Sequence, residues 1–160
     1  MGLQLQIACA PDIDTPAPGQ FESWAAAALA KAALHNGQRA GGELTIRVVD
    51  RPEMADLNRR YRRRAGPTNV LAFPFEGAEE VPVDILGDVV ICAPLVVAQA
   101  ARGRIPAMHH WAHLVVHGVL HLCGFDHQRE PAARRMEAME RDILAEFHIA
   151  LAGAPALQPL

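Results

Sequence analysis

The amino-acid sequence predicts one domain of the α+β class, with a small four-stranded mixed sheet and about five helices. Three observations favour this class. The 160 residues are enough for one domain with its own core, and 51% of them are hydrophobic while 21% are charged. Four short stretches have the pattern of strands, and most of them lie early in the chain. About five longer stretches between glycine and proline breaks have helical composition.

The first half of the chain alternates strand and helix signals. Leu3, Leu5 and Ile7 alternate with glutamines, which is typical of a strand. The alanine-rich residues 20–36 then predict a helix that ends at Gly37. A second strand is expected over residues 44–49.

The next helix has a clear beginning and end in the sequence. Asp50 is placed to cap it, and Pro52 lies in its first turn. We expect this helix to end at Gly66 and Pro67. Residues 69–73 and 87–92 are the third and fourth strand candidates.

Three more helices are expected in the second half. Pro94 begins a short helix that runs to about residue 101, and Pro106 begins a longer one that ends at Gly124. A last helix is expected over about residues 131–147. We expect residues 1–150 to form the domain and the Ala/Pro-rich residues 151–160 to form a flexible tail.

Charge and cysteine content restrict the function classes. The net charge of -3 excludes a globally basic protein, so that a nucleic acid would need a local basic patch. The three cysteines are widely separated and suggest no disulfide framework, which favours a reducing compartment. We expect no signal peptide, since residues 1–6 have no basic start and no long apolar run, and no apolar run approaches the ~20 residues of a membrane span. We therefore expect a cytoplasmic protein with no membrane partner.

The strongest chemical signal is the motif H-x-x-x-H-x-x-G-x-x-H, formed by His117, His121, Gly124 and His127. Two histidines four residues apart project from one face of a helix. Gly124 can adopt the left-handed conformation that ends the helix and turns the chain, so that His127 returns toward the other two. Three imidazoles and an open fourth position are typical of a catalytic zinc site. We expect one zinc ion per chain.

The same spacing is found in metzincin proteases, which predicts a metzincin-like metal helix. Those enzymes have glutamate directly after the first histidine as the general base. This chain has Gly118 at that position, which cannot transfer a proton. The sequence thus keeps the metal ligands of a peptidase but not its base.

Other histidines of the same region have less defined roles. His113 lies one turn before His117, too far from His121 to share its ion easily, so that it is a candidate for substrate binding or for a position behind the ligands. His109 and His110 are expected at the surface. Asp126 can orient a ligand imidazole or belong to an ordinary turn.

Five arginines within residues 59–64 form a second signal. The run can be a solvated helix end, where basic residues also suit the helix dipole. Beside a metal site it suggests an anionic substrate, because guanidinium groups bind phosphate in a bidentate manner. Arg59 and Arg63 are therefore candidates for substrate binding. Asp88 is a further candidate, at the start of the fourth strand.

Four blocks of sequence resemble the YbeY family. They are LN-x-x-YR at residues 57–62, PTNVLAFPFE at 67–76, LGDVVIC at 86–92 and HWAHLVVHGVLHLCGFDH at 110–127. The blocks occur in the family's order, and the resemblance extends over about residues 55–147, most of the chain.

The resemblance implies a bacterial metal-dependent endoribonuclease that matures ribosomal RNA, including the 3′ end of 16S RNA, and acts in ribosome quality control. It places the zinc ligands on His117, His121 and His127, and the functional arginine on Arg62. The implied partners are single-stranded ribosomal RNA and the small ribosomal subunit, and no DNA is expected. In this hypothesis zinc activates water without a glutamate base, and Arg62 binds the scissile phosphate.

Two other functions remain open from the sequence. The metzincin-like spacing alone would suit a metal-dependent peptidase or amidase, although the base would have to come from elsewhere. A non-catalytic ribosome assembly factor is the third reading, in which zinc stabilises the fold and the arginines bind RNA. Whether water or the RNA 2′-OH attacks the phosphate is also open.

Overall fold

The computed structural model describes residues 3–9, 12–37, 41–75, 85–126, 128–151 and 157. Its elements are β1 (Leu3–Cys9), α1 (Pro18–Asn36), β2 (Gly42–Val49), α2 (Arg51–Arg62), β3 (Val70–Pro74), β4 (Ile85–Cys92), α3 (Ala93–Gly103), α4 (Ala107–Leu122) and α5 (Ala132–Ala145). The strand order is β1-β2-β4-β3, with β3 antiparallel to β4 and the other neighbours parallel. The expected α+β class with a mixed four-stranded sheet and five helices is confirmed. Most of the expected tail lies outside the described residues.

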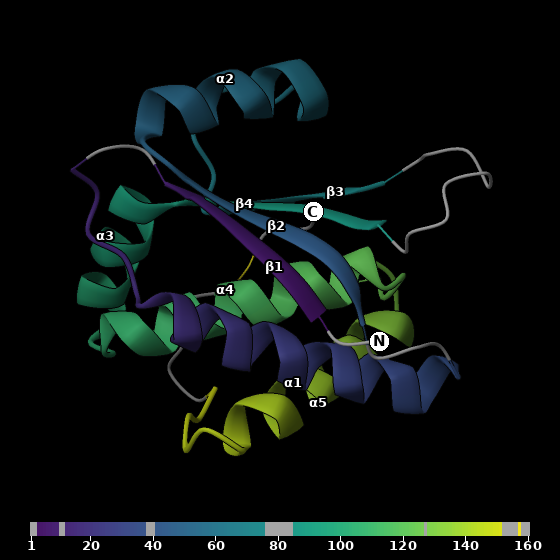
Figure 1. The fold of residues 1–160 in the computed structure, drawn as a ribbon. Helices are drawn as coiled ribbons and strands as arrows, with labels where there is room; N and C mark the ends of the chain where they lie inside the picture. Colours follow the sequence, from purple (N-terminus) through teal and green to yellow (C-terminus); the bar gives the residue numbers. More distant parts are fainter. Residues whose placement is uncertain are drawn as a thin grey trace.

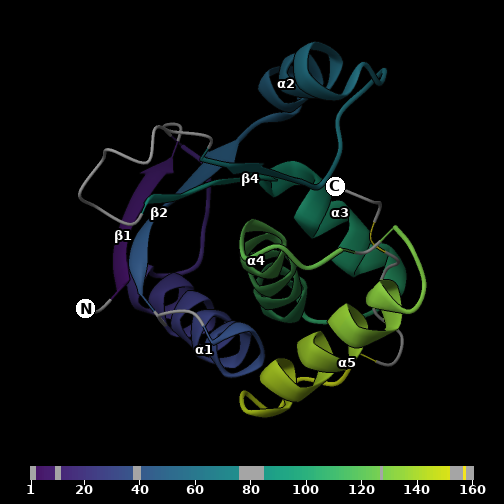
Figure 2. The same cartoon turned by 90° about the vertical axis from the view of Figure 1, so that its right-hand side faces the viewer.

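Helices cover the two faces of the sheet unequally. Figure 1 shows α1, α4 and α5 on one face and α2 on the other. In Figure 2, α4 lies in the middle of the molecule, between the sheet and the helices α1, α3 and α5. The contacts agree, since α4 packs against these three helices and against β3 and β4. The helix that carries the histidine motif is therefore the central helix of the domain.

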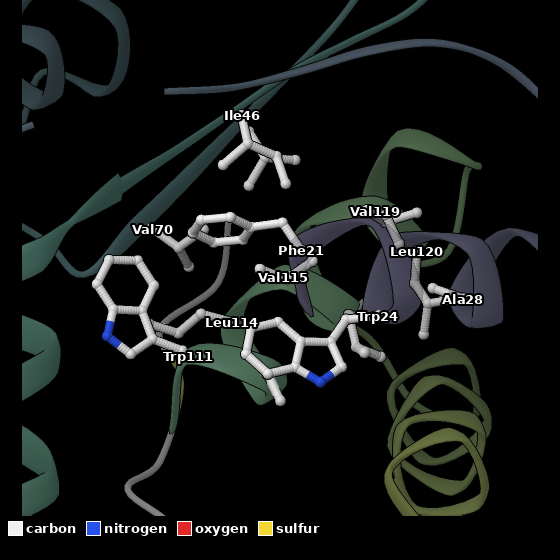
Figure 3. Close-up of a cluster of buried hydrophobic side chains, with 14 of the residues drawn as sticks. Phe21, Trp24, Ala28, Ile46, Val70, Trp111, Leu114, Val115, Val119 and Leu120 are labelled. Atoms are coloured by element: carbon white, nitrogen blue, oxygen red, sulfur yellow. The ribbon is translucent and has the colours of Figure 1, made fainter. Parts of the chain in front are cut away.

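The main core lies between the sheet and α4 (Figure 3). The Phe21 ring of α1 contacts Trp111 of α4 edge to face, with ring centroids 5.8 Å apart. Leu114 and Val115 of α4 are fully buried in the same cluster. A smaller apolar cluster on the other face fixes α2 to the sheet through Met54, which is also fully buried. The buried apolar surface of both clusters holds α2 and α4 on opposite sides of the sheet.

The ends of α2 position the arginine run. The Asp50 side chain accepts a hydrogen bond from the Glu53 backbone N–H at 3.0 Å, so that the expected cap is confirmed. The expected end at Gly66 and Pro67 is wrong, because the helix ends at Arg62. Arg63 adopts the left-handed conformation, with φ 55°, and its N–H bonds to the carbonyl of Arg59. The chain therefore leaves the helix within the arginine run.

Gly118 lies where α4 packs against β4. A Cβ at this position would lie 2.7 Å from Cγ1 of Val89, and the β-branched valine cannot easily move within the strand. Glycine thus allows the central helix to approach the sheet. The position that carries the general base in metzincins has no room for a side chain here.

We expect Gly118→Ala to lower the free energy of unfolding by about 2 kcal/mol, because the added methyl group overpacks the interface with Val89. Gly19→Ala in α1 is the matched control, since a Cβ there meets nothing within 4 Å. Urea denaturation measures both variants. Equal stability of Gly118→Ala and the wild type would contradict this account of the helix–sheet contact.

Candidate functional site

Three histidines of the motif region lie along one face of α4. His113, His117 and His121 follow at intervals of four residues, close to one helical turn. His113 and His117 are buried, whereas His121 is half-buried in the last turn of the helix. The row of imidazoles therefore runs from the interior of the domain toward its surface.

A buried carboxylate on α5 joins two of these imidazoles. Oε1 of Glu140 lies 2.8 Å from Nε2 of His113, and its Oε2 lies 2.8 Å from Nδ1 of His117. An ionised carboxylate only accepts hydrogen bonds, so that both ring nitrogens must be protonated and donate. This contact fixes the tautomer of neutral His117, with its lone pair on Nε2.

The pKa of Glu140 reflects these contacts. Burial by itself would raise the pKa, but the hydrogen bonds from His113 and His117 outweigh burial and lower the pKa to about 2. Glu140 is 3% exposed. A fixed negative charge therefore lies behind His117, where it can orient the imidazole and increase its basicity.

Glu140 was not among the residues singled out from the sequence, although a signal exists. On α5 the buried residues are Met136, Met139, Glu140, Ile143 and Leu144, which follow the spacing of one apolar helix face. A glutamate inside an apolar stripe must be paired, because an unpaired buried charge is costly. Its partners lie 23 and 27 residues away in the sequence, so that only the packing of α5 on α4 identifies them.

The charge of Arg62 acts on the outer end of this histidine row. The pKa of His121 is lowered by burial first and next by the positive charge of Arg62. The pKa of Arg62 itself is lowered by burial and by nearby Arg64. The side chain of Arg62 is half-buried, and its positive charge acts on His121 although the two residues belong to helices on opposite faces of the sheet.

The remaining arginines of the run lie at the surface. The Arg59 and Arg60 guanidinium groups contact the Asp56 carboxylate at 2.7 Å and 3.4 Å, and Arg63 is exposed. Both contacts are solvent-exposed pairs, which hold the side chains only weakly. The substrate-binding roles of Arg59 and Arg63 remain predictions.

Asp88 does not lie on the side of the sheet that carries the histidines. It is exposed on β4, two residues before Val90, which packs beneath α2. Residues two apart in a strand point to the same face. Its cross-strand partner is Phe73 of β3. A role of Asp88 beside the histidines is therefore not supported, and any contact with substrate would be made on the α2 face.

His110 is not at the surface, which corrects the expectation for this residue. It is fully buried, and its Nε2 lies 2.7 Å from Oε1 of Gln99, which also accepts a hydrogen bond from the Asn69 amide at 3.0 Å. Burial and the nearby His113 lower the pKa of His110 to about 4, so that it is neutral near pH 7. The histidine belongs to a buried network between α3, α4 and the start of β3.

Two other expectations depend on the turn after α4. Gly124 has φ 96°, in the positive range that was expected for it. The Asp126 carboxylate accepts a hydrogen bond from the Gln128 backbone N–H at 2.8 Å, as in an ordinary aspartate turn. His127 lies outside the described residues. Among the residues that are described, no three His, Cys, Asp or Glu side chains are grouped to hold a metal ion.

Comparisons with known proteins identify relatives over most of the chain. The family model described as Endoribonuclease YbeY matches residues 11–148. Proteins named Endoribonuclease YbeY from Nitrosococcus oceani and Methylococcus capsulatus are each 50% identical, over 84% and 81% of this chain and 85% and 81% of their own. The Alkalilimnicola ehrlichii protein of that name is 48% identical over 94% of this chain and 89% of its own.

A solved structure supports the fold. The solution structure of a Thermotoga maritima protein aligns with a TM-score of 0.58 over 91% of this chain and 92% of that protein. The two sequences are 20% identical, so that this likeness concerns the fold alone.

Proposed function

The chain belongs to the YbeY family of endoribonucleases, and on this premise we propose that it cleaves single-stranded RNA at a metal site on α4. The ligands we propose are His117, His121 and His127. Arg62 binds the scissile phosphate. In the cell the substrate is ribosomal RNA of the small subunit, including the 3′ end of 16S RNA, and the protein acts in the cytoplasm, in RNA maturation and in ribosome quality control.

The observation that carries this proposal is the contact between Glu140 and His117. A histidine that binds a metal usually donates its other ring N–H to a carboxylate or carbonyl, which fixes the tautomer and the ring orientation. His117 meets this condition, since Nδ1 donates to Glu140 and the lone pair is on Nε2. His121 follows one turn later and has a lowered pKa, which favours the neutral form that binds metals. The described part of the site therefore fits a metal ion.

Zinc is the ion that suits this donor set best, with one ion per chain, because neutral imidazoles and an open position are typical of catalytic zinc. When bound, the zinc ion acts as a Lewis acid that activates water at neutral pH. His113 is buried and contacts Glu140, which favours a place behind the ligands over contact with RNA. Glu140 then accepts hydrogen bonds from both histidines and fixes the orientation of the His117 ring.

Arg62 supplies the positive charge for the phosphodiester. Its side chain is half-buried and its charge acts on His121, so that a phosphate bound between the two residues would be shielded from part of the solvent. Charge on the phosphate increases in the transition state, and a positioned guanidinium stabilises that charge. Arg62 moves no proton, since a guanidinium stays protonated near pH 7.

The peptidase alternative lacks a proton-transfer group at the expected place. The residue after the first histidine is Gly118, which packs against Val89 and leaves no space for a glutamate. A metzincin-type peptidase uses a glutamate at this place as its general base, and this chain has no group there that could act as one.

We expect Arg62→Ala to lower kcat/KM for a single-stranded RNA oligomer about 100-fold, because it removes a charge that stabilises the transition state. Arg62→Lys retains the charge without the bidentate geometry, so that its kcat/KM should lie between those of Arg62→Ala and the wild type. Arg134→Ala, on an exposed arginine of α5, is the matched control. The duplex and the DNA of the same sequence should not be cut.

Removal and return of the metal complete this test. A chelator should stop cleavage while circular dichroism remains that of a folded protein, and added zinc should restore the activity. Unfolding on chelation, with no cleavage by the zinc-loaded protein, would instead favour the non-catalytic assembly factor. Cleavage by Arg62→Ala at the wild-type rate would show that Arg62 has no role in the reaction.

A further inference from the structure

Two aromatic rings lie together on the sheet face that carries α2. Tyr61, in the last turn of α2, is 60% exposed, and its ring centroid lies 5.2 Å from that of Phe73 in β3, at an interplanar angle of 65°. Phe75, just after β3, is 48% exposed. Phe73 is half-buried beneath α2, and its ring contacts the exposed ring of Tyr61, a residue whose apolar ring and polar end make it typical of binding surfaces.

The charge around these rings suits a polyanion. The Arg60 guanidinium lies 5.9 Å from the centroid of the Tyr61 ring, and Arg62, Arg63 and Arg64 follow directly in the chain. The protein as a whole carries a net charge of -3, so that this run of arginines is a local concentration of positive charge. Arginine together with exposed aromatic rings is the composition of surfaces that bind single-stranded nucleic acid.

Asp88 indicates which part of a nucleotide fits beside the rings. It is exposed on β4 as the cross-strand partner of Phe73, and such partners have Cβ atoms about 5 Å apart. A carboxylate repels phosphate, but it accepts hydrogen bonds from the amino groups of bases. The aromatic side of this surface is therefore suited to a base, while the phosphates are attracted to the arginines.

We propose that Tyr61 and Phe73 form a stacking site for one base of the RNA, next to the phosphate that Arg62 binds. This inference rests on the proposed function, since it places a nucleotide of the same substrate. Because Tyr61 and Arg62 are consecutive residues, the stacked base belongs to a nucleotide close to the cleavage position. A paired base could not present its face to the ring, so that the site also explains a requirement for a single strand.

Steady-state kinetics on the metal-loaded protein test this site. Tyr61→Leu should raise KM for the RNA oligomer about tenfold with a smaller change in kcat, because stacking on a ring is lost. Tyr61→Phe keeps the ring and should retain the wild-type KM. Leu34→Ala, at an exposed apolar residue of α1, is the control for removal of apolar surface elsewhere.

Oligomers with a single abasic nucleotide make the test specific. We expect one position near the cut at which the missing base raises KM for the wild type but not for Tyr61→Leu, as in a double-mutant cycle. The stacking site is wrong if Tyr61→Leu and the wild type have equal KM values, or if both proteins are equally sensitive to every abasic position. Neither result would contradict the proposed RNA cleavage. If the wild type cuts no RNA, both proposals fail.

A spectroscopic readout is independent of how Tyr61→Leu folds. Tyr61 is the single tyrosine of the chain, so that 3-fluorotyrosine gives one ¹⁹F resonance. Hexa-adenylate should shift this resonance through the ring current of the stacked base, whereas inorganic phosphate should not. An unchanged resonance at saturating hexa-adenylate would contradict the proposal, and would be the result for a surface that contacts only a protein partner.

Discussion

Glu140→Ala is expected to lower the free energy of unfolding by about 3 kcal/mol and to weaken metal binding 10- to 100-fold, by order of magnitude. The variant removes the acceptor of two buried N–H groups, on His113 and His117, and leaves both imidazoles without the charge that orients them. Urea denaturation of the metal-free protein measures the first effect. Competition with a chromophoric zinc chelator measures the second.

The control for this prediction lies on the same helix. Glu137 is exposed and only contacts Arg141 at 3.7 Å, so that Glu137→Ala should change stability and zinc affinity little. Glu140→Gln tests the charge, because an amide can accept from one imidazole but presents its own N–H groups to the other. Zinc affinity of Glu140→Ala equal to that of Glu137→Ala would show that the carboxylate does not act on the ligands.

His117→Ala is expected to abolish RNA cleavage and to release the metal, since it removes the proposed ligand whose ring is hydrogen-bonded to the buried Glu140 carboxylate. The measurement combines cleavage of a single-stranded oligomer with elemental analysis of the purified protein. His148→Asn is the control, because His148 is exposed on the surface and has φ 60°, which asparagine tolerates. A folded His117→Ala protein that cuts RNA at the wild-type rate would show that the active site does not lie on α4.

The sequence predicts this fold well where the signals are local. The alternation of Leu3, Leu5 and Ile7 predicts β1, and the Asp50 cap predicts the beginning of α2. The four-residue spacing of His117 and His121 requires only that the segment is helical, which is confirmed. The end of α2 was not predicted, because the left-handed conformation of Arg63 ends the helix before the stronger signal of Gly66 and Pro67.

The contacts between distant elements could not be predicted from local patterns. The amphipathic pattern of α5 shows that Glu140 shares a face with apolar residues, but not that the face meets His113 and His117. His110 was expected at the surface because it lies near a helix start, yet α4 lies in the middle of the domain and is buried from His110 over most of its remaining length. Asp88 was named only as a substrate-binding candidate at the start of a strand, since the sequence does not tell which sheet face α4 covers. No helix among the described residues is long and apolar enough to cross a membrane.

The proposed function requires that one metal ion is bound by the imidazoles at the end of α4. Anomalous diffraction at the zinc absorption edge, from crystals of the zinc-loaded protein, locates this ion. We predict a single anomalous peak about 2.0–2.1 Å from Nε2 of His117, with His121 and His127 as the other protein ligands and no fourth side chain. A peak elsewhere, or a fourth protein ligand that closes the site, would contradict the account.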